Sequence, residues 1–371
     1  MDISFKFDPE VHIGADTLSM AGTICRRHGE RIMISADHTL DPQTVNRLKE
    51  ILEDSGIETI VFDGIEEDSP VDMAENIVEL SQAAHCNAIV GFGGRKTQLI
   101  ARMAAIMAPM RISVFELLEG RMFQNKFLPL ISIPVEGLDS FSLTENFIAA
   151  DPRNRLIKSI QSPHGLYSAV IIDSSLFKFA PNVAAVYILE GFFSALEAYC
   201  SAKANFLSDA LLERSLSFFA KLLKSGMNAD IYAQASFLTA LGNSASSPGA
   251  GAALAYAINA RFPVSKQVCS AVLLPFMAEK LASARPEKMA RVASFLGNTK
   301  AASVAEAANS TADGIRRCME ALHVKPDLKE FNISLDRLAA GVVAARNLDF
   351  VANSPWIVSE EEVLKIMRDI I

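Results

Sequence analysis

The strongest constraint on the fold of this chain is an alternation of strand and helix patterns that occupies its first half and then stops. From Arg31 the apolar segment RIMIS is followed by a polar turn, by a helical pattern over residues 45–56 and by the strand pattern TIVFDG. The same order returns as a helical pattern over residues 73–84 and the strand pattern NAIVGFGG, and further strand patterns occupy residues 128–134 and 167–175. Strands that alternate with helices predict a parallel, doubly wound sheet, whose ligands bind at the carboxyl ends of the strands.

The second half of the chain has no strand patterns. After Phe177 nearly every segment places Ala, Leu, Glu and Lys at helical spacing, with Asn, Ser, Pro and Gly between the segments. A chain of 371 residues is long for one hydrophobic core and suits two domains. We therefore predict a Rossmann-like α/β nucleotide-binding domain over residues 1–177 and an all-helical domain over residues 178–371.

Charge and composition argue against several classes of partner. The net charge is -8 and no basic run reaches five residues, so the sequence offers no electrostatic surface for nucleic acid or for an anionic membrane. No apolar run approaches the roughly 18 to 20 residues that span a bilayer, and the first residues, MDISFKFDPE, carry acids where a secretory signal carries bases. The five cysteines occur singly, without the C-x-x-C spacing of a zinc site. We expect a soluble, cytoplasmic protein with reduced, buried thiols that binds neither nucleic acid nor membrane.

Two features of the first half predict a nucleotide site. Residues 90–97, VGFGGRKT, follow a strand pattern, and glycines at such a turn let backbone N–H groups approach a pyrophosphate at the N-terminus of the next helix. Arg95 either obstructs that approach or pairs with phosphate through its guanidinium. Asp37 ends the first strand of the alternating region, where a carboxylate accepts ribose hydrogen bonds and disfavours a 2′-phosphate, so we predict NAD rather than NADP. A tight turn that binds nothing, with a turn-forming Asp37, remains the alternative for both features.

Four short strings in the second half carry a family resemblance. They are LEAYCS at 196–201, NFLSDALLERSL at 205–216, SAVLLPFM at 270–277 and ANSPWIVSEEEVLKIM at 352–367. Each string alone is a weak match, but all four occur in the order and spacing of one family. Together with the order of the domains they resemble the iron-containing alcohol dehydrogenase family, within the larger group that includes glycerol dehydrogenase and dehydroquinate synthase. The resemblance covers almost the whole chain. It implies a dehydroquinate synthase-like architecture, a small-molecule ligand in the cleft between the domains, and a homodimer.

The resemblance also implies two cofactor loops. The first is the family's G-G-G-S-x-x-D-x-A-K loop, in which Arg95 replaces the third glycine, Leu99 the aspartate and Arg102 the final lysine. The second, P-T-T-A-G-T-G-S-E, matches only as PVEGLDSFS at 134–142, so that Glu136 and its neighbours bring carboxylates toward an anionic cofactor, which is unfavourable. The cofactor-binding residues predicted from the loops and from the first strand are Asp37, Gly93, Gly94, Arg95, Lys96 and Ser140.

The metal site of the family is not conserved in this sequence. The resemblance implies four metal-binding positions: an Asp, a His four residues later, and two further His fourteen residues apart. In this sequence these positions are Glu190, Ser194, Ala252 and Lys266, and no histidine lies between His164 and His323. One oxygen ligand is too few for a catalytic transition metal, and an ammonium would occupy the cation's own place. We therefore expect no bound metal.

Lys266 facing Glu190 would replace the charge of the metal by that of an ammonium, although both side chains pointing to solvent is the alternative. Tyr256 stands where the family often has a further histidine, and with Lys266 it would serve as proton donor in a metal-free carbonyl reduction, unless it only packs. The candidate catalytic residues are therefore Lys266, Tyr256 and Glu190.

Three interpretations of the function follow. The first is a divergent oxidoreductase of this family, NAD(P)-linked and acting on a small alcohol or aldehyde, with its metal ligands replaced. The second is a non-catalytic protein that uses the same fold to bind a nucleotide, another ligand or a partner. The third is a different enzyme that uses the cleft without metal or redox chemistry.

Overall fold

The computed structural model describes residues 1–371 apart from 1–4, 6, 67, 122–126, 163–166 and 299. The chain divides into two compact units. The first, here called the sheet unit, comprises Met1–Asn154 and Lys158–Lys178, and the second, the helical unit, comprises Arg155–Ile157 and Phe179–Ile371.

The sheet unit is built around a six-stranded sheet in which every paired strand is parallel. The strand order is β1-β8-β5-β4-β2-β3, and a separate two-stranded sheet joins β6 to β7. The central strands β4, β5 and β8 are buried along their whole length, as expected for a parallel sheet covered on both faces. The doubly wound parallel sheet predicted from the alternation is confirmed. The strands are β1 Glu10–Gly14, β2 Arg31–Asp37, β3 Glu58–Ile65, β4 Ala88–Gly93, β5 Leu130–Pro134, β6 Asn146–Ala150, β7 Ile157–Gln161 and β8 Ala169–Asp173.

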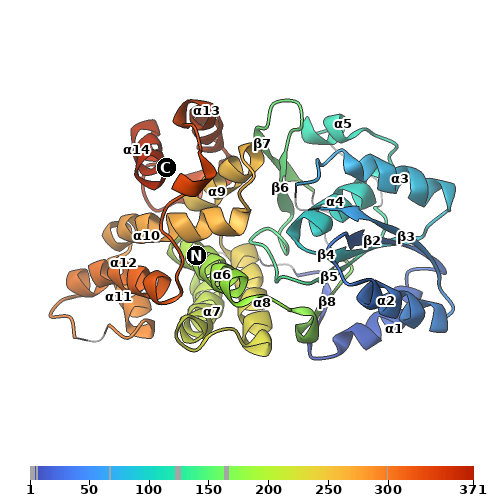
Figure 1. Ribbon diagram of the computed structural model, residues 1–371, viewed down its shortest axis with the longest axis horizontal. Helices are drawn as coiled ribbons and strands as arrows, with labels where there is room; N and C mark the ends of the chain where they lie inside the picture. The colour runs from blue at the N-terminus through green and yellow to red at the C-terminus, as the bar shows by residue number, and fades with distance from the viewer. Residues whose placement is uncertain (1–4, 6, 67, 122–126, 163–166, 299) are drawn as a thin grey trace. The chain divides into compact units, whose positions relative to one another are not determined.

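Helices cover both faces of the large sheet (Figure 1). On one side α1 and α2 pack together, and their residues Ile24 and Leu48 share a fully buried cluster with Ile32 and Ile34 of β2. On the other side α3 packs beside α4. The helices of this unit are η1 Thr17–Met20, α1 Ala21–Arg26, α2 Pro42–Asp54, α3 Met73–Ala83, α4 Arg95–Met107, α5 Val114–Leu118 and η2 Ser174–Leu176.

The helical unit contains no strand among its described residues beyond the start of β7. Local sequence sets its helix ends: the Asn205 side chain accepts from the backbone of Leu207 and Ser208 to begin one helix, and Ser359 with Glu362 forms a capping box for another. The helices are α6 Pro181–Cys200, α7 Phe206–Ser225, α8 Ala229–Ala245, α9 Ala250–Arg261, α10 Lys266–Ala284, α11 Pro286–Phe295, α12 Val304–Ala321, η3 Lys329–Phe331, α13 Leu335–Ala345, η4 Asp349–Asn353 and α14 Glu360–Ile370.

The central helix of this unit, α6, packs against α7, α8 and α10. In the described part of the chain it is the one helix whose length and composition alone would allow it to cross a membrane, and 83% of the relevant window is buried inside the protein. That burial places α6 in a protein core, where a helix that is apolar on all sides belongs.

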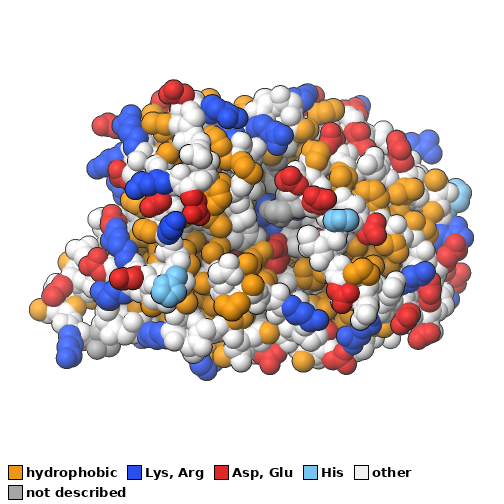
Figure 2. Space-filling view, in the orientation of Figure 1, with side chains coloured by type: hydrophobic (Ala, Val, Ile, Leu, Met, Phe, Trp, Pro, Cys, Tyr) orange, Lys and Arg blue, Asp and Glu red, His pale blue; other side chains and the backbone are white. Residues whose placement is uncertain are grey.

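One face of the molecule carries side chains of both charges. On the face shown in Figure 2, acidic and basic side chains are interspersed, and neither sign forms a continuous field. Of the five cysteines, Cys25, Cys86, Cys200 and Cys269 are buried, whereas Cys318 is only half-buried. Burial raises the pKa of the Cys200 thiol to about 12, so this cysteine is an inert core residue, as the sequence predicted.

Candidate functional site

The helical unit brings two of the predicted catalytic residues into direct contact. Ser265 caps α10 by accepting a hydrogen bond from the N–H of Val268, which makes Lys266 the first residue of the helix. The Nζ atom of Lys266 donates to Oε1 of Glu190 on α6, and the side chains of Lys266 and Glu190 are 1% and 10% exposed. The predicted inward orientation of Lys266 toward Glu190 is therefore confirmed.

Two more of the predicted residues surround this pair. One turn further along α6, the Ser194 hydroxyl donates to the same Oε1 of Glu190 over 2.9 Å. On α9, the ring of buried Tyr256 has its centroid 5.4 Å from Nζ of Lys266, within the range of a cation–π contact. The ammonium thus lies between a carboxylate and an aromatic face.

Glu197, further along α6, is another buried carboxylate within electrostatic reach of Lys266, and the sequence prediction did not include it. Its Oε1 and Oε2 atoms accept hydrogen bonds from the backbone N–H groups of Gly251 (2.7 Å) and Ala252 (2.8 Å) at the start of α9. A Cβ atom on Gly251 would lie only 2.8 Å from Oε1 of Glu197, so glycine is needed for this approach. Burial raises the pKa of the Glu197 carboxyl to about 7, against the backbone hydrogen bonds and the charge of Lys266, which lower it.

A sequence signal for Glu197 did exist. Glu190, Ser194 and Glu197 recur at helical spacing along α6, and they are the buried polar residues of that otherwise apolar helix. A polar stripe on a core helix predicts a polar site.

The sheet unit holds the second group of predicted residues, at the glycine-rich turn between β4 and α4. Gly94 is the extended residue before the first residue of α4, Arg95, and Lys96 follows half-buried in the first turn. The Gly94 N–H points toward Oδ2 of Asp37 over 3.4 Å. Asp37 also accepts from the backbone and the hydroxyl of Thr39, over 2.9 and 2.7 Å. Asp37 therefore lies beside the turn and already has hydrogen-bond donors from the chain.

The second predicted cofactor loop lies against the same turn. Gly93 and Pro134 end the neighbouring strands β4 and β5 in register, and the Val135 N–H donates to the carbonyl of Gly93 over 3.3 Å. One residue further, Oε1 of Glu136 accepts a hydrogen bond from the Arg95 N–H. Ser140 is buried within this loop.

Arg102, at the position of the family's lysine, supports the far end of that loop. Its guanidinium donates to the carbonyl of Thr144 over 2.8 Å and stacks over the ring of Phe147. Burial lowers the pKa of Arg102 to about 10.

Gln98, also on α4, links this helix to strands β4 and β5. Its side chain donates to the carbonyl of Gly91 on β4 and accepts from the Ser132 hydroxyl on β5, each over 2.8 Å. These contacts make Gln98 and Arg102 supports for the loops.

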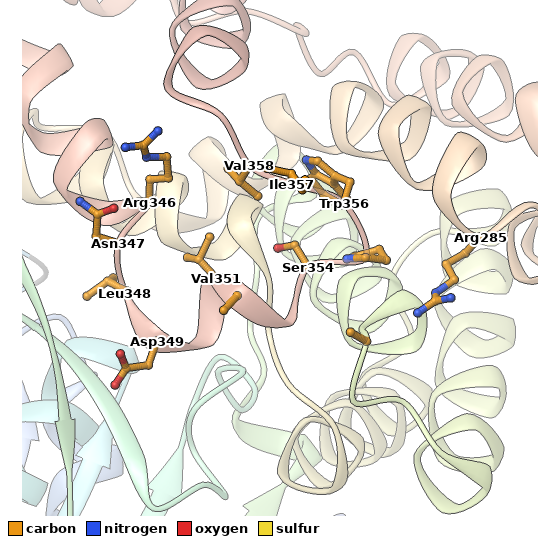
Figure 3. Close-up of a pocket in the computed structure, with 13 residues that line it drawn as sticks. Arg285, Arg346, Asn347, Leu348, Asp349, Val351, Ser354, Trp356, Ile357 and Val358 are labelled. Carbon is orange, nitrogen blue, oxygen red and sulfur yellow. The ribbon is translucent and has the colours of Figure 1, made fainter.

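The helical unit also contains a pocket of about 640 Å³ that was not predicted (Figure 3). Trp356, the single tryptophan of the chain, lines it together with Arg285, Arg346 and Asp349. Ser354 on its wall accepts a hydrogen bond from the N–H of Ala250 over 3.0 Å, which links the pocket to the start of α9.

A parallel sheet unit with a glycine-rich turn after a central strand, followed in the chain by an all-helical unit, defines the class of two-part proteins with a dehydroquinate synthase-like architecture. The sequence pattern described as "Iron-containing alcohol dehydrogenase" matches residues 8–174, and that described as "Fe-containing alcohol dehydrogenase family, C-terminal" matches residues 187–371. The chain belongs to the iron-containing alcohol dehydrogenase family of oxidoreductases.

Named relatives have similar sequences, and solved structures share the fold. Choline dehydrogenase of Bacillus subtilis is 26% identical over 301 residues, which cover 78% of this chain and 75% of that protein. The 1,3-propanediol dehydrogenase of Citrobacter freundii is 25% identical over 370 residues, 96% of this chain and 95% of that protein. A solved 1,3-propanediol oxidoreductase has a TM-score of 0.92 at 21% identity over 100% of both chains. Sulfoacetaldehyde reductase of Bifidobacterium kashiwanohense, solved with NAD+, has a TM-score of 0.81 at 15% identity over 100% of this chain and 99% of that one.

The metal ion in the family's name does not fit the residues present. Of the four positions, Ala252 offers a methyl group and Lys266 a cationic donor that cannot coordinate a cation. The Oε1 atom of Glu190 already accepts from Lys266 and Ser194. Within the described ranges, no three His, Cys, Asp or Glu side chains come together in a way that could hold a metal ion.

Proposed function

We propose that this protein is an NAD-linked oxidoreductase of a small alcohol or aldehyde in which the Lys266 ammonium replaces the catalytic metal charge. The observation that carries the proposal is the buried hydrogen bond from Lys266 to Glu190 in a chain of this oxidoreductase family. Bound NAD would accept or supply the hydride. The chain itself would then have to stabilise charge on the substrate oxygen and to move one proton.

Lys266 and Tyr256 would carry these two tasks. A positive charge in a site that excludes water stabilises an oxyanion far more than it does in water, and Lys266 is 1% exposed. Tyr256, whose ring faces that ammonium, would give a proton to the carbonyl oxygen during reduction and accept it during oxidation. Glu190 would fix the ammonium in position, and its negative charge would offset the cost of burying it.

Asp37, Gly94 and Lys96 are the residues that would hold the dinucleotide. Gly94 places no side chain of its own at the start of α4, and Asp37 lies where a ribose would be recognised. The sulfoacetaldehyde reductase solved with NAD+ supports this cofactor by its likeness in fold.

The proposal is tested with the purified wild-type chain, after dialysis against a chelator. We expect NAD to raise the melting temperature, and NADH-dependent reduction of a panel of small aldehydes to persist unchanged in the chelator. Activity that is lost on chelation and restored by iron or zinc would contradict the role of Lys266. The same assay is run on Lys266→Met, which removes the proposed catalytic ammonium. Lys280→Met is its matched control, because Lys280 pairs with Glu362 at the surface.

A second function, non-catalytic binding of a ligand on the same fold, is favoured by one observation. The first backbone N–H groups of the glycine-rich turn already face Asp37 and Glu136. A rise in melting temperature with a nucleotide, without turnover of any aldehyde or alcohol in the panel, would support this second function over the first.

The homodimer and the small-molecule ligand are implied by the family resemblance, whereas the cellular location and the excluded partners are expected from charge and composition. We propose a cytoplasmic homodimer that binds a small molecule and neither nucleic acid nor membrane. Sedimentation equilibrium of the purified chain tests the dimer, and a single species at monomer mass would exclude it.

A further inference from the structure

We propose that Glu136 is a built-in competitor of the cofactor: its carboxylate occupies the anion-binding place at the N-terminus of α4, and it must move before a diphosphate can bind there. This deepens the proposed function and rests on it only for the identity of the ligand. Glu136 is thereby a residue that determines which anions the turn accepts and how tightly.

The contact between Glu136 and the turn has the geometry of a bound anion. The Arg95 N–H, the first N–H of α4, donates to Oε1 of Glu136. A Cβ atom built on Gly94 would lie 2.7 Å from Oε1, 2.8 Å from Cδ and 3.2 Å from Oε2 of the same residue. The whole carboxylate therefore lies in the space that the missing side chain of Gly94 leaves. Glycine at such a turn serves to let an anion approach the backbone, and here the anion belongs to the chain.

A second carboxylate of the chain lies at the neighbouring backbone N–H of the turn. Oδ2 of Asp37 is 3.4 Å from the backbone nitrogen of Gly94 and 3.4 Å from the hydroxyl oxygen of Thr97. An incoming diphosphate would meet two negative charges at the donors that it needs, and like charges at such short range repel. Thr39 donates two hydrogen bonds to Asp37 and holds it in place. The Glu136 carboxylate is the group that fills the space beside Gly94, so Glu136 is the group that has to move.

The position of Glu136 is set by the sheet. Strands β4 and β5 are neighbours, and Gly93 is in register with Pro134 at their ends. The chain after Pro134 must therefore pass over the start of α4, and the hydrogen bond from Val135 to Gly93 holds it there. Arg102 holds the other end of the loop through the carbonyl of Thr144. Movement of the Glu136 side chain would free the Arg95 N–H and the space beside Gly94, while these two hydrogen bonds hold both ends of the loop.

A tethered group of this kind lowers the apparent affinity of a free ligand. The ligand binds only the fraction of molecules in which the turn is open, so its apparent dissociation constant rises by the inverse of that fraction. Because Glu136 is tethered to the turn by a few residues, its carboxylate has an effective concentration at the turn in the millimolar range or above. Even a weak contact then leaves the turn occupied by Glu136 for much of the time. Removing the carboxylate should therefore strengthen the binding of any diphosphate at this turn.

Calorimetric titration of the full-length chain tests the proposal with two probes, inorganic pyrophosphate and NAD. The variants are Glu136→Ala, which removes the carboxylate, and Glu136→Gln, which keeps its shape and removes its charge. Glu79→Ala is the control, because Glu79 is an exposed carboxylate on α3 whose loss changes the net charge equally. Circular dichroism and melting temperature establish that each variant is folded.

We expect pyrophosphate to bind Glu136→Ala at least about tenfold more tightly than wild type, Glu136→Gln to show an intermediate gain, and Glu79→Ala to match wild type. Affinities of wild type and Glu136→Ala within twofold of each other, or no binding to either, would overturn the proposal.

The NAD titration separates this result from the proposed function. A gain for pyrophosphate without any binding of NAD supports the role of Glu136 and removes NAD from the proposed function. If NAD binds wild type and Glu136→Ala equally tightly, NAD remains the proposed cofactor, and the proposal that Glu136 competes with it is contradicted.

Discussion

The Nζ atom of Lys266 at the start of α10 donates a hydrogen bond to Oε1 of Glu190 in the middle of α6, and both side chains are buried. Removal of one member leaves the other as an uncompensated buried charge. We expect Lys266→Met to lower the free energy of unfolding by about 3–5 kcal/mol, and Lys266→Met with Glu190→Gln to lower it by less. Chemical denaturation followed by circular dichroism measures both. The half-exposed Lys280 is the control, and Lys280→Met should cost under about 1 kcal/mol. Additive losses from the Lys266 and Glu190 substitutions would show that the two charges are not coupled.

Metal binding gives a second prediction. Because Glu190 is the single strong oxygen ligand among the four family positions, the purified protein should contain iron, zinc and manganese well below one equivalent per chain after dialysis. Elemental analysis by mass spectrometry measures this directly. About one tightly held metal ion per chain would show that ligands other than those four positions complete a site.

Glu197 predicts a pH dependence of stability. Burial raises the pKa of its carboxyl in the folded protein from 4.5 to about 7. Between these pH values the unfolded chain gives up the proton that the folded protein keeps, so the stabilising contribution is complete below about pH 4.5 and is lost as the pH rises through about 7. The free energy of unfolding of wild type should therefore fall relative to Glu197→Gln across this window, by at most about 3 kcal/mol. Parallel curves for the two proteins would mean that Glu197 is already ionised at the lower pH.

Asp37 predicts a preference for NAD over NADP. Its carboxylate lies beside the turn that would hold the dinucleotide and would meet a 2′-phosphate with like charge. Titration of both cofactors should give tighter binding of NAD to wild type, and Asp37→Asn should reduce the difference between them. Equal affinities in wild type, or a preference for NADP, would remove Asp37 from cofactor selection.

Tyr256 predicts a catalytic effect without a stability effect. In Tyr256→Phe the ring that faces the Lys266 ammonium is retained and the hydroxyl is lost. We expect kcat for aldehyde reduction to fall by about 100-fold or more, the usual range for loss of a positioned acid, while the melting temperature changes little. An unchanged kcat would assign Tyr256 a packing role alone.

The architecture could be predicted because it depends on local patterns. The alternation in the first half gave the parallel sheet, and the helical spacing after Phe177 gave the second unit. The short strands β1, β6 and β7 were not predicted. Strands β5 and β8 are equally short, but they are buried along their whole length, whereas β1, β6 and β7 are buried only in part and therefore give a weaker strand signal in the sequence. The start of α2 at Pro42, before the predicted residue 45, follows from the cap that the Asp41 side chain provides.

The candidate site could be predicted only where two positions were already linked by the family. Lys266 and Glu190 were paired because the family binds one ion with residues at both places, and their contact is present. Glu197 was missed because its partners are backbone N–H groups of Gly251 and Ala252, which no side-chain motif reports. The sequence predicted that the Glu136 carboxylate is unfavourable for an anionic cofactor. The contact of Glu136 with Arg95 could not be predicted, because it depends on β5 lying next to β4. Strand order is set by long-range packing, which alternation alone does not encode.

The backbone N–H groups at the start of α9 bind two parts of the helical unit that are distant in the sequence. The N–H of Ala250 is held by Ser354, and those of Gly251 and Ala252 are held by Glu197 of α6. None of these three amide protons can exchange with solvent deuterium until α9 separates from its partners. In a hydrogen-exchange experiment they should be replaced together and among the last of the chain, so their common rate would report the opening of this core as one cooperative event.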